Sequence, residues 1–120
     1  MENNRHELTE ADKLVVWRKA SIVSNTKPSI WRKDYAGAWI EYNKYGNTNS
    51  KYGWQADHLK PLAKGGIDDV SNMLPLHWKN NETKSDDYPQ WNTSVSSVGN
   101  KNKDKEQHWH IKNRIIEKDE

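Results

Sequence analysis

The sequence predicts an α+β domain with a helix near its N-terminus, short strands and a second helix in the middle, and a hairpin or helix extension at its C-terminus. Three observations lead to this fold class. A helical stripe begins after Thr9, and two short strand-like runs separated by Gly- and Asn-containing turns precede a polar helical segment at 77–84. With 32% hydrophobic residues, no Phe and 7 Trp, the core must be small and rich in Trp. A chain of 120 residues has room for one domain.

Composition excludes several classes of protein. The chain has no Cys, so it has neither disulfides nor a thiolate zinc site. No apolar run is long enough to cross a membrane or follows Met1 as a signal peptide would, so we expect a cytoplasmic protein without a membrane partner. The net charge of +2, from 19 basic and 17 acidic residues, does not indicate nucleic-acid binding. A phosphate-binding surface would therefore depend on local arrangement.

The first helix has a clear start. Thr9 is typical of an N-cap, with Glu10 and Asp12 in the first turn where the helix dipole favours anions. Apolar residues recur at helical spacing as far as Trp17, and we expect the helix to end within 21–25, before a breaker cluster at 25–28. Residues 1–8 are expected to form a flexible N-terminus, and residues 9–90 one domain that includes this helix.

The middle of the chain alternates β-prone and turn-forming residues. Residues 35–42 and 52–59 are β-prone and flank a turn-rich segment, so we expect them to pair as a hairpin. Residues 73–76 form a further short strand, and residues 77–84 a short helix that ends before Tyr88-Pro89.

The C-terminal segment is more ambiguous. Residues 91–98 fit a strand, and residues 107–116 fit either a strand or a helix, since Ile111 and Ile115 are spaced four apart. We expect a strand pair, so that residues 91–120 form an extension packed on or flanking the same domain. His108 and His110 would lie on one side of a strand as a metal clip, but a solvated role is favoured because no further ligands are nearby in sequence.

Residues 55–86 gather the groups that phosphodiester cleavage needs. Asp57 and His58 are adjacent at the end of a strand, Asn72 closes a loop, and Asn81 lies in the following helix. An imidazole can deprotonate water near neutral pH, and a carboxylate with an amide can hold a hard divalent ion with positions left open for phosphate. Neighbours on a strand point to opposite sides, so one residue can face the helix and the metal while the other faces the phosphate.

This segment resembles the HNH endonucleases, the ββα-metal nucleases, and specifically small stand-alone bacterial or phage members. The resemblance covers roughly residues 16–86. It rests on matched positions in the family's order: Asp57-His58, Pro61, Gly65-Gly66-Ile67-Asp68-Asp69, Asn72, Leu74-Pro75-Leu76, Asn81 and Lys84. It implies a ββα-metal core with an N-terminal helix and a C-terminal extension.

The resemblance also implies a role for each matched residue. His58 would be the general base, and Asp57 and Asn81 the metal ligands. Asn72 would pin the loop and orient His58, and Lys84 is a candidate phosphate contact. Asn80 competes with Asn81 if the helix register differs by one residue.

One departure from the family concerns zinc. Many members bind a structural zinc through CxxC pairs, but His77 and Asn80 stand at those places here, so no structural zinc is expected. The catalytic ion is expected to be one divalent cation per site, Mg²⁺ by preference, with Mn²⁺ or another divalent ion as the alternative.

The implied function is a metal-dependent endonuclease of low sequence specificity that leaves a 5′-phosphate and a 3′-hydroxyl. DNA is the expected substrate, RNA is the alternative, and the enzyme would act as a monomer or homodimer. One rival is a non-catalytic HNH-like module that binds nucleic acid or protein, as an inhibitor or decoy. Another is a nuclease toxin domain with an immunity protein as its partner.

The aromatic and basic residues outside this motif have simpler interpretations. Core packing is expected for Trp17, Trp39, Trp54 and Trp78, while Trp31, Trp91 and Trp109 are left open between packing and base stacking. Lys51 and Lys79 are two of several lysines that could follow a nucleic-acid backbone, although solvation is favoured for each one alone. Lys101 and Lys103 are interpreted as part of a solvated turn.

Overall fold

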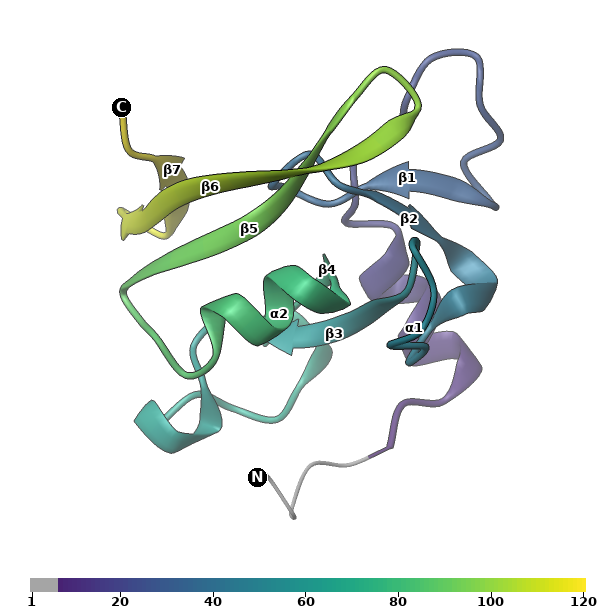
Figure 1. Cartoon of the computed structure of the whole chain (residues 1–120). Coiled ribbons are helices and arrows are strands. Elements are labelled where there is room, and N and C mark those ends of the chain that lie inside the picture. Colours follow the sequence, from purple (N-terminus) through teal and green to yellow (C-terminus); the bar gives the residue numbers. More distant parts are fainter. Residues whose placement is uncertain (1–6) are drawn as a thin grey trace.

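The computed structural model describes residues 7–120 and has an α+β fold of two helices and three small antiparallel sheets (Figure 1). The helices are α1 (Glu10–Trp17) and α2 (Trp78–Lys84). The strands are β1 (Trp31–Lys33), β2 (Trp39–Glu41), β3 (Trp54–His58), β4 (Met73–His77), β5 (Gln90–Val98), β6 (Lys101–Lys112) and β7 (Ile115–Lys118). In this part of the chain, no helix is long and apolar enough to cross a membrane.

Helix α1 begins as the sequence predicts and ends earlier. The Thr9 side chain accepts from the Asp12 backbone N–H, and the Asp12 carboxylate accepts from the Thr9 N–H, which completes a capping box. The predicted end within 21–25 is wrong, because α1 stops at Trp17. Ser21 instead exchanges backbone hydrogen bonds with Lys33, which extends the chain beside β1.

The predicted pairing of 35–42 with 52–59 is also wrong. β2 pairs with β1, and β3 pairs with β4 in a register that matches Trp54 with His77 and His58 with Met73. The cause is a tight turn between β1 and β2. In this turn the Asp34 carboxylate accepts from the Ala38 N–H at 2.8 Å, and Gly37 has a φ of +93°, which favours glycine.

The second helix and the C-terminal strands follow the sequence prediction more closely. α2 is one residue shorter at its start, where the His77 ring acts as its N-cap by accepting from the Lys79 N–H. Residues 107–112 lie in β6 and residues 115–116 in β7, on either side of a turn at 113–114, so the predicted strand pair is confirmed and the helical alternative is wrong. The extension is larger than a pair, because β7 adds a third strand to β5 and β6.

Two clusters of buried side chains form the core. The first contains Val16, Trp17, Ile40, Trp54 and Met73, and joins α1 to the central strands. Leu8, from the N-terminal segment predicted to be flexible, also packs against this cluster. Residues 1–6 of that segment lie outside the described residues. The second contains Ala36, Trp91 and Trp109. The expected packing of Trp17, Trp39 and Trp54 is confirmed, whereas Trp78 is only half-buried.

The central hairpin and α2 form a continuous unit. α2 follows β4 without a loop and packs against both β3 and β5, and Figure 1 shows it in front of β3 and below the β5–β6 hairpin. This position places the side chains of α2 between the end of β3 and the C-terminal sheet.

Candidate functional site

Asp57 lies on the face of β3 that turns toward α2. Its carboxylate is buried, and Oδ2 is 3.2 Å from the ammonium of Lys84. Lys84 has an exposed fraction of 0%, also donates to the His58 carbonyl at 3.3 Å, and lies 5.5 Å from the centre of the Trp91 ring. The ammonium of Lys84 therefore holds Asp57 and the end of β3 against α2. A buried lysine in this position acts on Asp57, whereas a direct contact to phosphate remains a prediction.

His58 points to the other side of β3. The ring is 2% exposed, and Nε2 is 2.9 Å from Oδ1 of Asp68 in the loop between β3 and β4. Because a carboxylate oxygen accepts this hydrogen bond, a neutral His58 carries its proton on Nε2 and keeps Nδ1 as the basic nitrogen. Sequence reasoning placed Asp68 only in an acidic turn and missed its contact with the imidazole. An acidic residue in the loop that follows a candidate base was the signal that could have identified Asp68, because a carboxylate can orient an imidazole.

Asn72 ties the loop between the two strands together. Its Oδ1 accepts from the Lys60 N–H at 3.1 Å, and its Nδ2 donates to the carbonyls of Lys60 and Ile67, each at 2.9 Å. Gly66 is required beside it, since a Cβ at that position would lie 1.8 Å from the Lys60 carbonyl oxygen. These contacts determine the path of the loop that carries Asp68.

Asn80 and Asn81 are neighbours on α2 with different surroundings. Asn81 is half-buried, and its Nδ2 donates to Oε1 of Gln55 on β3, which turns its amide oxygen away from that strand residue. Asn80 is fully buried, donates to Asp34 and to the Val95 carbonyl, and accepts from the N–H groups of Ser94 and Val95. The side chain of Asn80, the alternative to Asn81 as a metal ligand, is therefore used in hydrogen bonds inside the core. Gln55, on the same strand face as Asp57, is a second residue that sequence reasoning missed.

The donor set is suited to a hard divalent cation. Asp57 and Asn81 offer a carboxylate and an amide oxygen from the facing sides of β3 and α2, and such oxygen ligands are those that Mg²⁺ prefers. Within residues 7–120, no three His, Cys, Asp or Glu side chains are grouped so that they could hold a metal ion. An ion at this site would therefore need ligands beyond the protein carboxylates, such as water and phosphate oxygens.

His77 and Asn80 take part in one hydrogen-bond network with Asp34. His77 Nε2 donates to the Lys51 carbonyl at 2.8 Å, and Asp34 accepts from the His77 N–H at 2.9 Å and from Asn80 at 3.0 Å. Burial lowers the pKa of His77 and raises the pKa of Asp34 to about 6. The network joins the β1–β2 turn to the junction of β4 and α2.

Tyr35 lies between this network and the C-terminal sheet. Burial raises the pKa of its phenol, and the negative charges of Asp57 and Asp34 add to the effect. Its hydroxyl accepts from the Trp91 indole N–H at 3.0 Å. Tyr35 therefore remains a neutral phenol at physiological pH.

The two histidines of β6, His108 and His110, contact different residues. His108 Nδ1 contacts the Asn92 side chain, while His110 contacts Asp119 through Nδ1 at 2.5 Å and Glu117 through Nε2 at 3.1 Å. The His110 contacts hold β7 to β6.

Comparisons of the chain with protein-family models, with curated proteins and with solved structures found no match.

Proposed function

We propose that this protein is a divalent-metal-dependent endonuclease of the HNH type that hydrolyses phosphodiester bonds, with DNA as its preferred substrate. The observation that carries the proposal is the β3–loop–β4–α2 unit, which directs Asp57 toward α2, directs His58 toward Asp68, and closes the intervening loop with Asn72. This arrangement gives one strand a candidate metal ligand and a candidate base, the two kinds of group that metal-assisted hydrolysis of a phosphodiester uses.

In the proposed reaction, Nδ1 of His58 takes a proton from water while Asp68 holds the imidazole through Nε2. The resulting hydroxide attacks phosphorus, the bond to the 3′ oxygen breaks, and the departing oxygen takes a proton from solvent water, leaving a 5′-phosphate and a 3′-hydroxyl. Asp57 and Asn81 would hold the divalent ion, which stabilises negative charge on the phosphate and on the leaving oxygen. Lys84 positions Asp57 for this task.

A supercoiled-plasmid assay tests the proposal. We expect nicking in the presence of Mg²⁺, loss of nicking with a chelator, and a decrease of about 100-fold or more in His58→Ala, because general-base catalysis contributes about that much. His108→Ala is the matched control, since it removes an exposed histidine from β6. Circular dichroism verifies that each variant is folded.

Two results would contradict the proposal. Full activity of His58→Ala would exclude this residue as the base. Absence of cleavage by folded protein with Mg²⁺, Mn²⁺ and other divalent ions would favour a non-catalytic binding module instead.

A further inference from the structure

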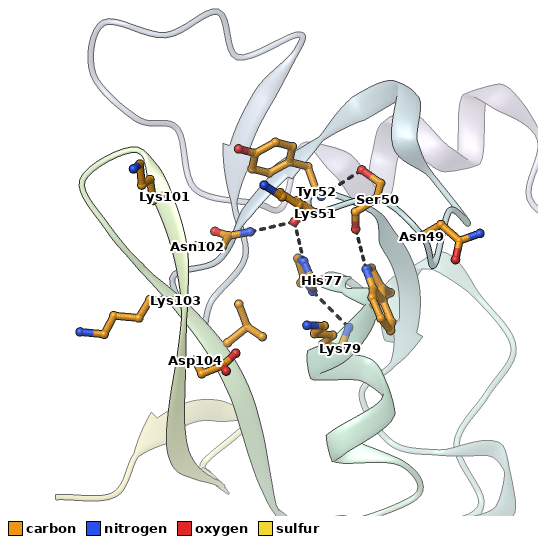
Figure 2. A pocket seen from close by; sticks show the side chains of 12 residues that line it. Asn49, Ser50, Lys51, Tyr52, His77, Lys79, Lys101, Asn102, Lys103 and Asp104 are labelled. Atoms are coloured by element: carbon orange, nitrogen blue, oxygen red, sulfur yellow. Dashed lines mark hydrogen bonds between the residues drawn. The ribbon is translucent and has the colours of Figure 1, made fainter.

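Two adjoining cavities lie at the end of the β3–β4 hairpin that is remote from His58. The larger, of about 530 Å³, separates the β5–β6 hairpin from the start of α2, and Lys51, Tyr52, Trp78 and Asn102 are among the residues that line it (Figure 2). The smaller, of about 290 Å³, is lined by Thr26, Trp31, Trp39, Tyr52 and Asn100. Tyr52 lines both, so the two cavities share a wall.

The smaller cavity has aromatic walls set at right angles. The Trp31 ring meets the rings of Tyr52 and Trp39 at 90°, with centroids 5.0 Å and 6.3 Å apart. Trp39 is anchored by its indole N–H, which donates to the Gly99 carbonyl at 2.9 Å, and the Lys33 ammonium lies 4.8 Å from its ring centroid. Trp31 and Tyr52 are only half-buried. A flat aromatic ligand suits such walls, while the nearby lysine disfavours a cationic one.

The boundary between the two cavities is basic. Lys51 directly precedes Tyr52, and Lys101 directly follows Asn100. Both lysines are exposed, and among the described residues neither ammonium forms an ion pair with a carboxylate. Asp104 is the carboxylate that lines the larger cavity, and Figure 2 shows Lys103 directed away from it.

The floor of the larger cavity is held in place by hydrogen bonds. The Lys51 carbonyl accepts from His77 Nε2 at 2.8 Å and from Asn102 Nδ2 at 3.0 Å, and Figure 2 shows Asn102 reaching it from the left and His77 from below. Asn102 also exchanges hydrogen bonds with the backbone of Trp39. The C-terminal hairpin is therefore fastened to the central unit across the cavity, and the surface is preformed.

We propose that these cavities bind unpaired nucleotides of a single-stranded nucleic acid, with a base in the aromatic cavity and neighbouring phosphates on Lys51 and Lys101. Aromatic platforms beside basic side chains are the combination that binds single strands. A duplex does not fit, because its bases are paired and stacked, so their faces are not available to Trp31 or Tyr52. The inference rests on the proposed function only for the fate of the bound strand. Its scissile bond would lie at Asp57 and His58, about 10–13 Å along β3 from Trp54, where that strand begins.

Fluorescence anisotropy with labelled 20-nucleotide probes tests the inference. The probes are a single-stranded DNA, an RNA of the same sequence and the DNA duplex, each titrated with His58→Ala protein in chelator so that no cleavage occurs. We expect at least one of the two single strands to bind about 10-fold more tightly than the duplex. Because no hydrolysis is measured, absence of nuclease activity would end the proposed function and leave this test intact.

Two variants report on the two parts of the surface. Lys51→Gln with Lys101→Gln should raise Kd about 10-fold and reduce the slope of log K against log salt by about 1.4, since each lost phosphate contact on a single strand accounts for about 0.7. Trp31→Leu should raise Kd about 10-fold through loss of one stacked base. Near-UV circular dichroism verifies folding of the Trp31 variant, and the exposed lysine variant decides the test if that protein does not fold.

Lys112→Gln with Lys118→Gln is the matched control, because it removes the same charge from exposed positions at the far end of β6 and on β7. Its Kd should stay within twofold of the parent protein. Three results would overturn the inference: an equal loss of affinity in this control, tighter binding of the duplex than of either single strand, or an unchanged Kd in the Lys51 and Lys101 variant.

Discussion

At the scale of single residues, the candidate site depends on two pairs of adjacent residues whose side chains point in different directions. Asp57 and His58 diverge because successive strand residues point to opposite sides, and each meets a partner of complementary charge or hydrogen-bonding capacity, Lys84 or Asp68. Asn80 and Asn81 diverge because α2 turns one side chain into the C-terminal sheet and the other toward Gln55. In each pair, the two adjacent residues therefore contact different parts of the protein.

The asparagine pair gives a direct test of the helix register. Asn81→Ala should abolish most Mg²⁺-dependent cleavage and leave the free energy of unfolding within about 0.5 kcal/mol of the parent, because this half-buried side chain is not part of the packing network. Asn80→Ala should destabilise the fold by about 3 kcal/mol, because it leaves buried groups of Ser94, Val95 and Asp34 without their partner. Plasmid nicking and urea unfolding measure the two effects. Normal nicking by Asn81→Ala would refute its assignment as a ligand.

Asp68 gives a test of the imidazole's orientation. Asp68→Asn should lower the nicking rate by about 10- to 100-fold, because the amide can offer an N–H to Nε2 and so favour the wrong tautomer of His58. Asp69→Asn is the control, since the Asp69 side chain instead caps the short helix at Val70–Asn72. Equal rates for the Asp68 variant and the parent would show that His58 acts without this carboxylate.

At the scale of elements, Asp34 joins parts of the chain that are far apart in sequence. Its carboxylate accepts from Ala38 in the β1–β2 turn, from the His77 N–H at the end of β4, and from Asn80 of α2. Asn80 continues the connection to β5. This buried network holds the central unit to the surrounding strands.

The network makes stability depend on pH. Burial raises the pKa of Asp34 to about 6 from a usual value near 4, so its ionisation removes stability as pH rises through that interval, on the order of 3 kcal/mol. Burial lowers the pKa of His77, which has the opposite effect, because stability is lost as pH falls below about 6.5. The contribution of Asp34 is therefore best measured as the difference in unfolding free energy between the parent protein and a variant that lacks this carboxyl group.

Asp34→Asn provides that difference, since His77 titrates in both proteins. We expect the parent to be more stable than the variant by a margin that narrows as pH rises from 4 to 7. Urea unfolding at four pH values measures it, with Asp87→Asn, an exposed carboxylate, as the control. A margin that stays constant or widens over this range would contradict the raised pKa of Asp34.

At the scale of the whole molecule, the C-terminal sheet completes the core around α2. Trp91 of β5 lies against the Lys84 ammonium and Val95 bonds with Asn80, so the interior side of α2 is covered by β5. The β5–β6 hairpin also reaches back to Trp39 and Lys51 through Asn102. Residues 91–120 therefore pack on the domain that carries the candidate site.

Truncation tests this dependence. A chain that ends at Tyr88 should lose cooperative unfolding, because Lys84 and Asn80 would become exposed without their partners on β5. A chain that ends at Lys112 lacks only β7 and should fold with a loss of about 1–2 kcal/mol, since β7 contributes mainly the half-buried Ile116. Thermal unfolding followed by circular dichroism compares them. A cooperative transition in the shorter chain would show that the central unit is stable alone.

Local chemistry explains what the sequence alone could predict. The capping box at Thr9, the start of α2 near His77 and the strand nature of residues 73–76 and 91–98 follow from contacts within a few residues. The candidate residues are likewise recognised by their order along the chain. These features depend on propensity and spacing, which a sequence carries directly.

Contacts between distant segments were decided by the tertiary structure. The pairing of β3 with β4, the early end of α1 and the contact of Lys84 with Trp91 each depend on a partner that local preference does not specify. The same is true of the difference between Asn80 and Asn81, which are chemically identical and adjacent in sequence. The sequence by itself determined the chemistry available to this protein, while burial and long-range hydrogen bonds decided which of its groups are used for packing and which face the candidate site.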